Sequence, residues 1–335
     1  MSVFIIAEAG VNHNGSLDLA FKLCDKAKEA GVDAIKFQTW ITENIVTKTV
    51  DLASYQEKNI ATKNDSQFQM LKKLELSFDD FIEIQKYCFN IGLHFLSTPD
   101  DEESLDFLVG LNLNFLKIGS GEVTNIPYLR HIGSKKLPVV LSTGMSTLSD
   151  VRLAYTTLIK SGATEVALLH CTTNYPCPMN EVNLNAMITL KKEFNCRVGY
   201  SDHTLGIEVP IAAVALGATI IEKHFTLNKS MDGPDHLASL NPSELKEMVL
   251  AIRNIEKALG SGIKEPNPSE KEISKVVLKS IVAKKNISKG ELFSEDNLTV
   301  KRAKGGISAQ KWDFVIGKEA NHNYLPDELI EIDKI

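Results

Sequence analysis

Two histidines, His203 and His224, each lie within three residues of the end of a short apolar segment of the sequence. A neutral imidazole is a common ligand for divalent metals, and two of them leave coordination positions open for substrate and water. A lone histidine is more often hydrogen-bonded within the protein, so the prediction depends on the two being neighbours, with Asp202 and Glu222 beside them. On that condition we expect His203 and His224 to share a divalent metal.

Lys36 and Lys117 lie within two other apolar segments and are expected to point into the fold, with Lys223 adding a third ammonium group. Buried cations need anionic partners, and the phosphate or carboxylate of a small substrate is one source of them. The alternative is an internal ion pair with one of three glutamates, Glu8, Glu122 and Glu222. The first interpretation predicts a site for a small and highly anionic molecule.

The other polar motifs repeat this placement along the chain. They follow successive apolar segments at 12–15, 97–99, 119–122, 142–145, 170–175 and 201–203. One such motif is often a structural hydrogen bond at the end of a strand, but a whole set facing inward would be a costly way to build a core. We therefore expect these motifs to form one site.

The segments that carry the motifs are short, apolar and rich in β-branched residues. They occupy 4–7, 34–37, 94–96, 115–118, 139–141, 166–169, 198–200 and 219–222. Near-continuous hydrophobic strands that alternate with helical periods are typical of parallel sheets covered on both faces. One such helix should begin after Ser16 and end at Gly31. Eight β-α units in about 250 residues favour a TIM (β/α)8 barrel. A doubly wound dinucleotide fold is disfavoured because no GxGxxG follows the first strand.

Composition divides the chain into parts. Residues 1–260 would form the barrel domain and end with a helix at 243–259, and residues 261–276, rich in Gly, Pro, Ser and charge, predict a linker. Residues 277–335 read as short strands and turns of a separate small domain. At that size it is marginal alone and is expected to dock on something.

Overall composition argues against several classes of partner. The formal net charge of −6 disfavours nucleic acid and anionic membranes as partners. Five cysteines with no CxxC pair indicate reduced thiols of a cytoplasmic protein. No segment reaches the length of a membrane span, and the N-terminus lacks the basic start of a signal peptide.

Eight motifs, in order, carry a resemblance to a known family: IAEAGVNHNG, IKFQTW, STP, LKIGSGE, LSTGM, VGYSDHTLG, IEKHFTL and GPDHLAS. The chain resembles the N-acetylneuraminate (sialic acid) synthase family, in its sialic and legionaminic acid branch, and its tail is similar to that family's antifreeze-like (SAF) domain. The resemblance implies a TIM barrel followed by the antifreeze-like domain, in a swapped homodimer.

The resemblance also implies roles for individual residues. Phosphoenolpyruvate would be held by Lys36, Thr98, Lys117, Ser120, Asn174, Ser201 and His203, with Thr173 as the alternative to Asn174. A divalent metal, Mn²⁺ or Mg²⁺, would be bound by His203 and His224. The sugar would be contacted by Glu8, Gln38, Tyr175, Asp235 and Arg302, the last reaching across from the partner's tail. Catalysis would involve Glu8, Lys36, Lys117 and Glu122, with Glu122 orienting a water.

The implied reaction is that of a metal-dependent transferase. Phosphoenolpyruvate, water and an N-acylated mannosamine-type sugar would give phosphate and either N-acetylneuraminate or N,N'-diacetyllegionaminate. Two departures from the family pattern concern the acceptor: Asp100 stands where many members have Phe, and KRAKGGIS surrounds Arg302 in place of the commoner KRPGxGIS. Alternatives are a pseudaminate synthase, a Schiff-base class I aldolase, a synthase acting on an aldose phosphate, and a carbohydrate-binding module on an inactive barrel.

Overall fold

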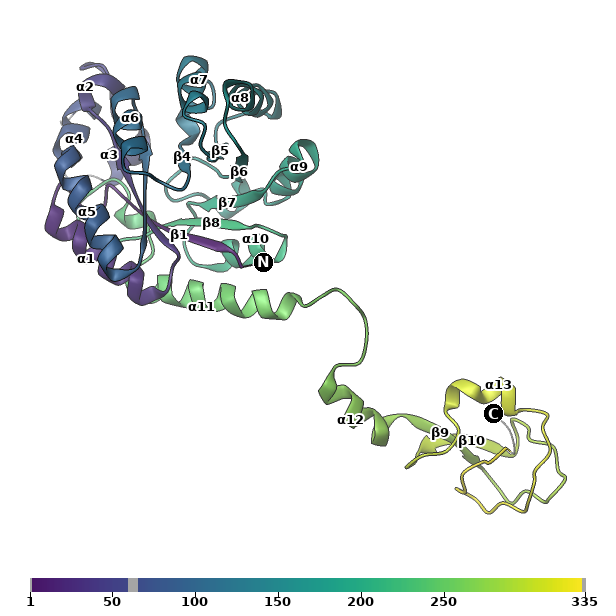
Figure 1. The fold of residues 1–335 in the computed structure, drawn as a ribbon. Coiled ribbons are helices and arrows are strands. Elements are labelled where there is room, and N and C mark those ends of the chain that lie inside the picture. The colour runs from purple at the N-terminus through teal and green to yellow at the C-terminus, as the bar shows by residue number, and fades with distance from the viewer. Residues whose placement is uncertain (1, 60–65, 333–335) are drawn as a thin grey trace. The chain divides into compact units, whose positions relative to one another are not determined.

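The computed structural model describes residues 2–59 and 66–332 and divides into two compact units, Met1–Gly260 and Ser261–Ile335 (Figure 1). Each unit has its own hydrophobic core. Within the described parts of the chain, no helix is both long and apolar enough to cross a membrane.

The first unit is built on a sheet of eight parallel strands in the order β3-β2-β1-β8-β7-β6-β5-β4. β3 and β4, at the two ends of this order, lie next to one another, so the sheet nearly closes into a barrel. This confirms the predicted TIM-like fold. The strands are β1 (Phe4–Gly10), β2 (Ala34–Thr39), β3 (His94–Pro99), β4 (Leu116–Ile118), β5 (Val139–Ser142), β6 (Val166–His170), β7 (Val198–Asp202) and β8 (Ile220–His224).

All eight predicted strand segments form strands, but most run further than predicted. The additional residues lie at the C-terminal ends, and most of them are polar. Glu8, for example, is in register with Lys36 on one side and His224 on the other. Every second one of these side chains, such as Glu8 and His224, points into the barrel while the backbone continues the ladder, so polarity alone does not end the strand.

Helices surround the strands, as Figure 1 shows. α1 begins after Ser16, whose hydroxyl accepts from the Leu19 N–H at 3.4 Å, and ends at Gly31 with φ 83°, both as predicted. The helices of this unit are α1 (Leu17–Ala30), α2 (Thr42–Ile45), α3 (Ser54–Asn59), α4 (Gln67–Leu74), α5 (Phe78–Ile91), α6 (Glu102–Gly110), α7 (Ile126–Ser134), α8 (Leu148–Ser161), α9 (Asn185–Phe194), α10 (Glu208–Ala215) and α11 (Pro242–Leu259).

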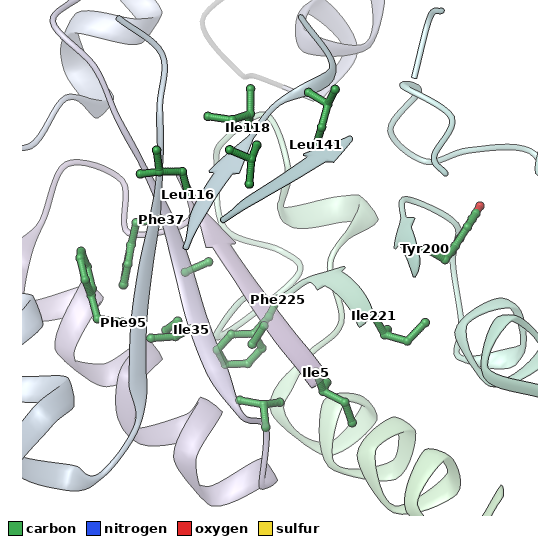
Figure 2. Close-up of a cluster of buried hydrophobic side chains, with 14 of the residues drawn as sticks. Ile5, Ile35, Phe37, Phe95, Leu116, Ile118, Leu141, Tyr200, Ile221 and Phe225 are labelled. Atoms are coloured by element: carbon green, nitrogen blue, oxygen red, sulfur yellow. The ribbon is translucent and has the colours of Figure 1, made fainter. Parts of the chain in front are cut away.

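Alternation along the strands creates two apolar layers. Outward-facing residues such as Ile5, Phe37 and Tyr200 pack against the helices in the main core, which Figure 2 shows drawing on strands β1 to β5, β7 and β8. A second, smaller cluster of strand residues fills the barrel interior: Phe4, Ile6, Ala34, Leu96, Phe115, Val140, Ala167, Leu169 and Ile220. This interior cluster forms an apolar floor, and the polar side chains of the same strand faces stand above it.

The second unit contains a two-stranded antiparallel sheet, β9 (Lys279–Ala283) and β10 (Leu298–Arg302), and a short helix, α13 (Trp312–Val315). Its core includes Ile281, Phe293 and Tyr324, all buried. The segment predicted as a linker, 261–276, contains most of helix α12 (Pro268–Val277). Proline at its first position and an Asn267–Glu270 capping box begin this helix, so local capping outweighs the polar composition there.

Candidate active site

A cavity of about 170 Å³ opens at the C-terminal ends of the barrel strands, where active sites of this fold lie. We name it the inner cavity. Its lining comes from all eight strands or the turns that follow them, and the lining residues are Glu8, Lys36, Gln38, Thr98, Asp100, Lys117, Gly119, Ser120, Gly121, Ser142, Met145, Cys171, Thr173, Tyr175, Ser201, His203, Glu222 and His224. Nearly every strand-end motif identified in the sequence is represented.

Two lysines and two glutamates form a buried charge network at the base of this cavity. Lys36 Nζ lies 2.8 Å from Glu8 Oε2 and 3.8 Å from Glu222 Oε2, and Lys117 Nζ lies 3.4 Å from Glu222 Oε1. Hydroxyl groups complete the shell, because Thr98 accepts from Lys36 at 2.9 Å and Ser142 accepts from Lys117 at 2.8 Å. The internal ion pairs that the sequence left open are therefore present, with Glu8 and Glu222 as partners.

The charged groups in this network shift one another's pKa values. Burial alone would lower the pKa of Lys36, but the carboxylates of Glu222 and Glu8 outweigh burial and raise it. For Lys117 burial prevails and lowers the pKa. Lys117 and Lys36 together overcome burial at Glu222 and lower its pKa to about 2, whereas burial raises the pKa of Glu8 to about 7. Glu222 is thus the constant anion, and Glu8 can carry a proton near neutral pH.

His203 and His224 lie side by side on the wall of the inner cavity. Their ring centroids are 5.3 Å apart, and the ring of Tyr175 lies 4.2 Å from that of His203 and 5.2 Å from that of His224. The predicted adjacency of the two histidines is present, since β7 and β8 are neighbouring strands.

The two imidazoles have the chemistry of metal ligands. Burial lowers the pKa of both side chains, and for His224 the neighbouring His203 adds to the effect, so both rings are neutral near pH 7. His203 Nδ1 lies 2.6 Å from the Thr172 carbonyl oxygen, which fixes the proton on Nδ1 and leaves the lone pair on Nε2. His224 Nδ1 is buried without a hydrogen-bond partner among the described residues. The pair fits a divalent cation.

Three side chains meet around Gly144: Ser120 from the turn after β4, and Cys171 and Thr173 from the loop after β6. Ser120 Oγ accepts from the Gly144 N–H at 2.9 Å and lies 3.2 Å from Cys171 Sγ. A methyl group at Gly144 would overlap Thr173 Oγ1, which is buried and has no hydrogen-bond partner in the described part of the chain. The absence of a side chain at Gly144 keeps these hydroxyl and thiol groups together.

Four residues predicted for the site do not line the inner cavity. Glu122 lies on a 3₁₀ turn beyond β4 and accepts from Asn125 Nδ2 at 2.7 Å. Asn174 is not among the lining residues, whereas its neighbour Thr173 is. Asp235 is buried behind His224, with 3.6 Å between its Oδ2 and His224 Nδ1. Arg302 belongs to the second unit, where it is exposed on β10.

The expectation that Lys223 contributes to the anionic site is wrong. Its side chain is fully buried outside the barrel interior, with Nζ 2.5 Å from Asp202 Oδ2 and bonded to the Thr204 carbonyl oxygen. Glu222 and His224 face the cavity, so Lys223, between them on the same strand, must face the opposite way.

Sequence reasoning gave no role to Met145 and Cys171, although both line the cavity. The available signal was position: each lies within three residues of the end of a strand whose other polar residues were singled out. Both lie within motifs that were expected to form the site, 142–145 and 170–175, but their thioether and thiol groups suggested no individual role.

The chain matches the model of the NeuB family over residues 23–264 and that of the SAF domain over residues 279–335. It is 52% identical to an N,N'-diacetyllegionaminic acid synthase of Campylobacter jejuni, over 97% of this chain and 98% of the relative. It is 49% identical to a protein of the same name in Legionella pneumophila, over 96% of this chain and 92% of the relative. A crystal structure of an N-acetylneuraminic acid synthetase from Leptospira borgpetersenii superposes with a TM-score of 0.72 at 36% identity, covering 82% of this chain and 90% of that one.

These similarities and the lysine and histidine cavity at the C-terminal face of the barrel define the chain as an enzyme of the sialic and legionaminic acid synthase class. The chain belongs to the NeuB family, as its motifs indicated.

Proposed function

We propose that the chain is a nonulosonic acid synthase that condenses phosphoenolpyruvate with an N-acylated mannosamine-type sugar. The favoured acceptor is 2,4-diacetamido-2,4,6-trideoxymannose, which would give N,N'-diacetyllegionaminate, because the two bacterial relatives described above bear that product's name. The observation that carries the proposal is the convergence of Lys36, Lys117, His203 and His224 on one cavity of a NeuB-family barrel.

Phosphoenolpyruvate fits the cationic and hydroxyl-rich part of the inner cavity. Its carboxylate and phosphate would be held by Lys36 and Lys117 together with the hydroxyls of Thr98, Ser120 and Ser201. Thr173, whose buried hydroxyl has no protein partner among the described residues, is favoured over Asn174 for the phosphate. Such preorganised charges stabilise an anionic substrate and the charge that moves during the reaction.

The acceptor aldehyde would lie against His203, His224 and Tyr175. A divalent cation held by the two imidazoles, Mn²⁺ or Mg²⁺, would supply a Lewis acid for the aldehyde oxygen. Among the described residues no three His, Cys, Asp or Glu side chains group as a metal centre, so two protein ligands would leave the remaining positions to water and substrate.

The reaction balances with one water and no net proton. C3 of phosphoenolpyruvate bonds to the aldehyde carbon, and the aldehyde oxygen takes up a proton. Water adds to C2 and loses one proton, which replaces the proton given to the aldehyde oxygen. As the C2–O bond breaks, phosphate leaves with the bridging oxygen, and the new C2 hydroxyl becomes the keto group by giving its proton to the phosphate. Glu8, whose pKa is about 7 because it is buried, is the residue we assign as proton donor to the acceptor oxygen.

The proposed enzyme works as a swapped homodimer in the cytoplasm. Arg302 is exposed on β10 of the second unit, where it is available to complete a partner's sugar site. Five unpaired cysteines suit a reducing compartment.

The direct test is phosphate release from phosphoenolpyruvate with Mn²⁺ in the presence of separate candidate acceptors. We expect release that depends on 2,4-diacetamido-2,4,6-trideoxymannose, with less or none for N-acetylmannosamine and for the pseudaminate precursor. Pyruvate that becomes covalently trapped on a lysine by borohydride, without acceptor-dependent phosphate release, would instead establish the class I aldolase.

The metal role has a test that does not depend on turnover. Titration calorimetry of the chelator-treated protein should show Mn²⁺ binding to the wild type and none to His203→Ala or His224→Ala, and circular dichroism should show both variants folded. Full activity in the presence of excess chelator would rule the cation out.

A further inference from the structure

The inner cavity has too little space for both proposed substrates. Its volume is about 170 Å³, whereas sites for small organic ligands span about 300–1,000 Å³. A second cavity of about 430 Å³, which we name the outer cavity, lies over the loops after β3 and β4. Asp100 is the residue that lines both cavities. An acceptor held by its aldehyde end in the inner cavity therefore has room to extend past Asp100.

The backbone of Asp100 is held by a hydrogen bond, whereas its carboxylate is available to a ligand. Its N–H donates to the Thr39 carbonyl oxygen at 3.0 Å, which holds the residue at the rim. The carboxylate makes no hydrogen bond or ion pair with the residues that the structure describes. The neighbouring Asp101, by contrast, is committed: it accepts from the N–H groups of Ser104 at 3.0 Å and Ile41 at 2.8 Å.

The two cavities have opposite polarity. Lys36 and Lys117 lie in the inner cavity, whereas the outer cavity is lined by four consecutive acidic residues, 100–103, and by no Lys, Arg or His among the described residues. An anion is therefore attracted inward and repelled from the outer wall. A neutral molecule rich in O–H and N–H groups meets acceptors on that wall.

We propose that Asp100 determines acceptor specificity, which deepens the function proposed above and rests on it. Its carboxylate accepts a hydrogen bond from an amide N–H or a hydroxyl on the part of the sugar remote from the aldehyde. With the other acidic side chains of the outer wall, it excludes sugars phosphorylated at that end. Burial raises the pKa of Asp100 to about 7, which agrees with a carboxylate that lacks a protein donor.

The test compares the variants Asp100→Asn and Asp100→Leu with three acceptors: 2,4-diacetamido-2,4,6-trideoxymannose, N-acetylmannosamine and N-acetylmannosamine 6-phosphate. Asp100→Asn keeps an acceptor oxygen and removes the charge, and Asp100→Leu removes both. The matched control is Asp79→Asn, an exposed carboxylate on α5 that lines neither cavity. Kinetics at pH 8 give separate KM values for acceptor and phosphoenolpyruvate, and Tm verifies that each variant is folded.

We expect Asp100→Leu to raise the acceptor KM about ten- to hundredfold, the usual effect of losing a charged hydrogen bond, with little change in the KM for phosphoenolpyruvate. Asp100→Asn should keep kcat/KM for the best neutral sugar within about threefold of wild type and raise that for the 6-phosphate at least about tenfold. Asp79→Asn should behave as wild type throughout.

Three results would overturn the inference while leaving the proposed function intact: an unchanged acceptor KM in Asp100→Leu, an equal rise in both KM values, or wild-type turnover of the 6-phosphate as fast as of the neutral sugars. If Asp100→Leu does not fold, the inference is tested by Asp100→Asn alone. The quantity compared with wild type is then the ratio of kcat/KM for the phosphorylated acceptor to kcat/KM for the neutral acceptor. A wild-type protein that turns over none of the three acceptors would contradict the proposed function, and this inference with it.

Discussion

At the scale of single residues, Asp100 is a half-buried carboxylate that has no hydrogen-bond donor among the described residues. The same isolation that makes it available to a ligand has a cost in stability. Its pKa is about 7 in the folded chain against an ordinary value of 3.8. Between these two values the folded state binds the extra proton, so stability falls as the pH rises through this window, and the loss is complete above about pH 7.

Asp100→Asn should therefore stabilise the protein, and more so at pH 8 than at pH 5.5. The amide does not titrate, so it avoids the cost of a buried charge at the higher pH. The check is a comparison of Tm for variant and wild type at both pH values, with about 2–4 °C expected for each kcal/mol. A gain that is larger at pH 5.5 would contradict the assigned direction of the pKa shift.

For His224 and Glu8, residue type predicts membership of the site but not the pKa of the side chain. Their chemistry marked them as site residues in the sequence, and the cavity contains both. Their pKa values, however, depend first on burial and then on groups remote in sequence: Lys36 lies 28 positions from Glu8 along the chain (36 − 8), and His203 lies 21 positions from His224 (224 − 203). These groups are brought together by the order of strands in the sheet, which no local sequence pattern predicts.

At the scale of elements, the turn after β5 brings together the side of the cavity where we propose that phosphate binds. Ser120, Cys171 and Thr173 reach one point only because Gly144 has no side chain. An added Cβ would overlap Thr173 Oγ1 and come within 3.0 Å of Ser120 Oγ and 3.1 Å of Cys171 Sγ.

Gly144→Ala should accordingly raise the KM for phosphoenolpyruvate about tenfold or more, since a displacement of about 1 Å in a polar site has effects of this size. Steady-state kinetics with saturating acceptor gives the value. The matched control is Gly110→Ala on α6, where an added Cβ meets nothing within 4 Å. Equal KM values for the two variants would show that the crowding at Gly144 does not matter.

Lys223 and Asp202 form a second buried ion pair, which lies between β7, β8 and the turn that precedes α10. Removing one member of a buried pair costs about 3–5 kcal/mol because the other charge stays behind. We therefore expect Lys223→Met to lower the free energy of unfolding by about that amount in urea titrations. The double variant with Asp202→Asn should regain most of the loss. A single variant as stable as wild type would mean that this pair does not hold the strands.

Element order was predictable from the sequence because eight apolar segments alternate with amphipathic helices. The ends of strands were not, since inward polar residues such as Ser201 still extend the ladder. The error at Lys223 has a related origin. Its charge suggested a role in the site, but side chains alternate along β8, so Lys223 faces away from Glu222 and His224. Helix α12 was missed because composition was weighed above its capping signals.

At the scale of the whole molecule, the proposed swapped dimer makes each active site from two chains. Mixing two inactive variants, Arg302→Ala and His203→Ala, should then restore activity after subunit exchange. Random exchange gives about half heterodimers, each with one complete site of two, so recovery should approach about one quarter of wild type.

The exchange itself is verified by mass spectrometry of differently tagged subunits. Heterodimers that form but show no recovery would contradict the contribution of Arg302 to a partner's site. Residual activity in Arg302→Ala alone sets the baseline for the comparison.

The most direct test of the central claim follows one oxygen atom. Phosphoenolpyruvate labelled with ¹⁸O in its bridging position is incubated with the protein, Mn²⁺ and 2,4-diacetamido-2,4,6-trideoxymannose, and both products are analysed by mass spectrometry. The proposed reaction predicts acceptor-dependent formation of the diacetylated nine-carbon acid, with the label in phosphate. Label retained in the sugar acid, or phosphate release that ignores the acceptor, would contradict it.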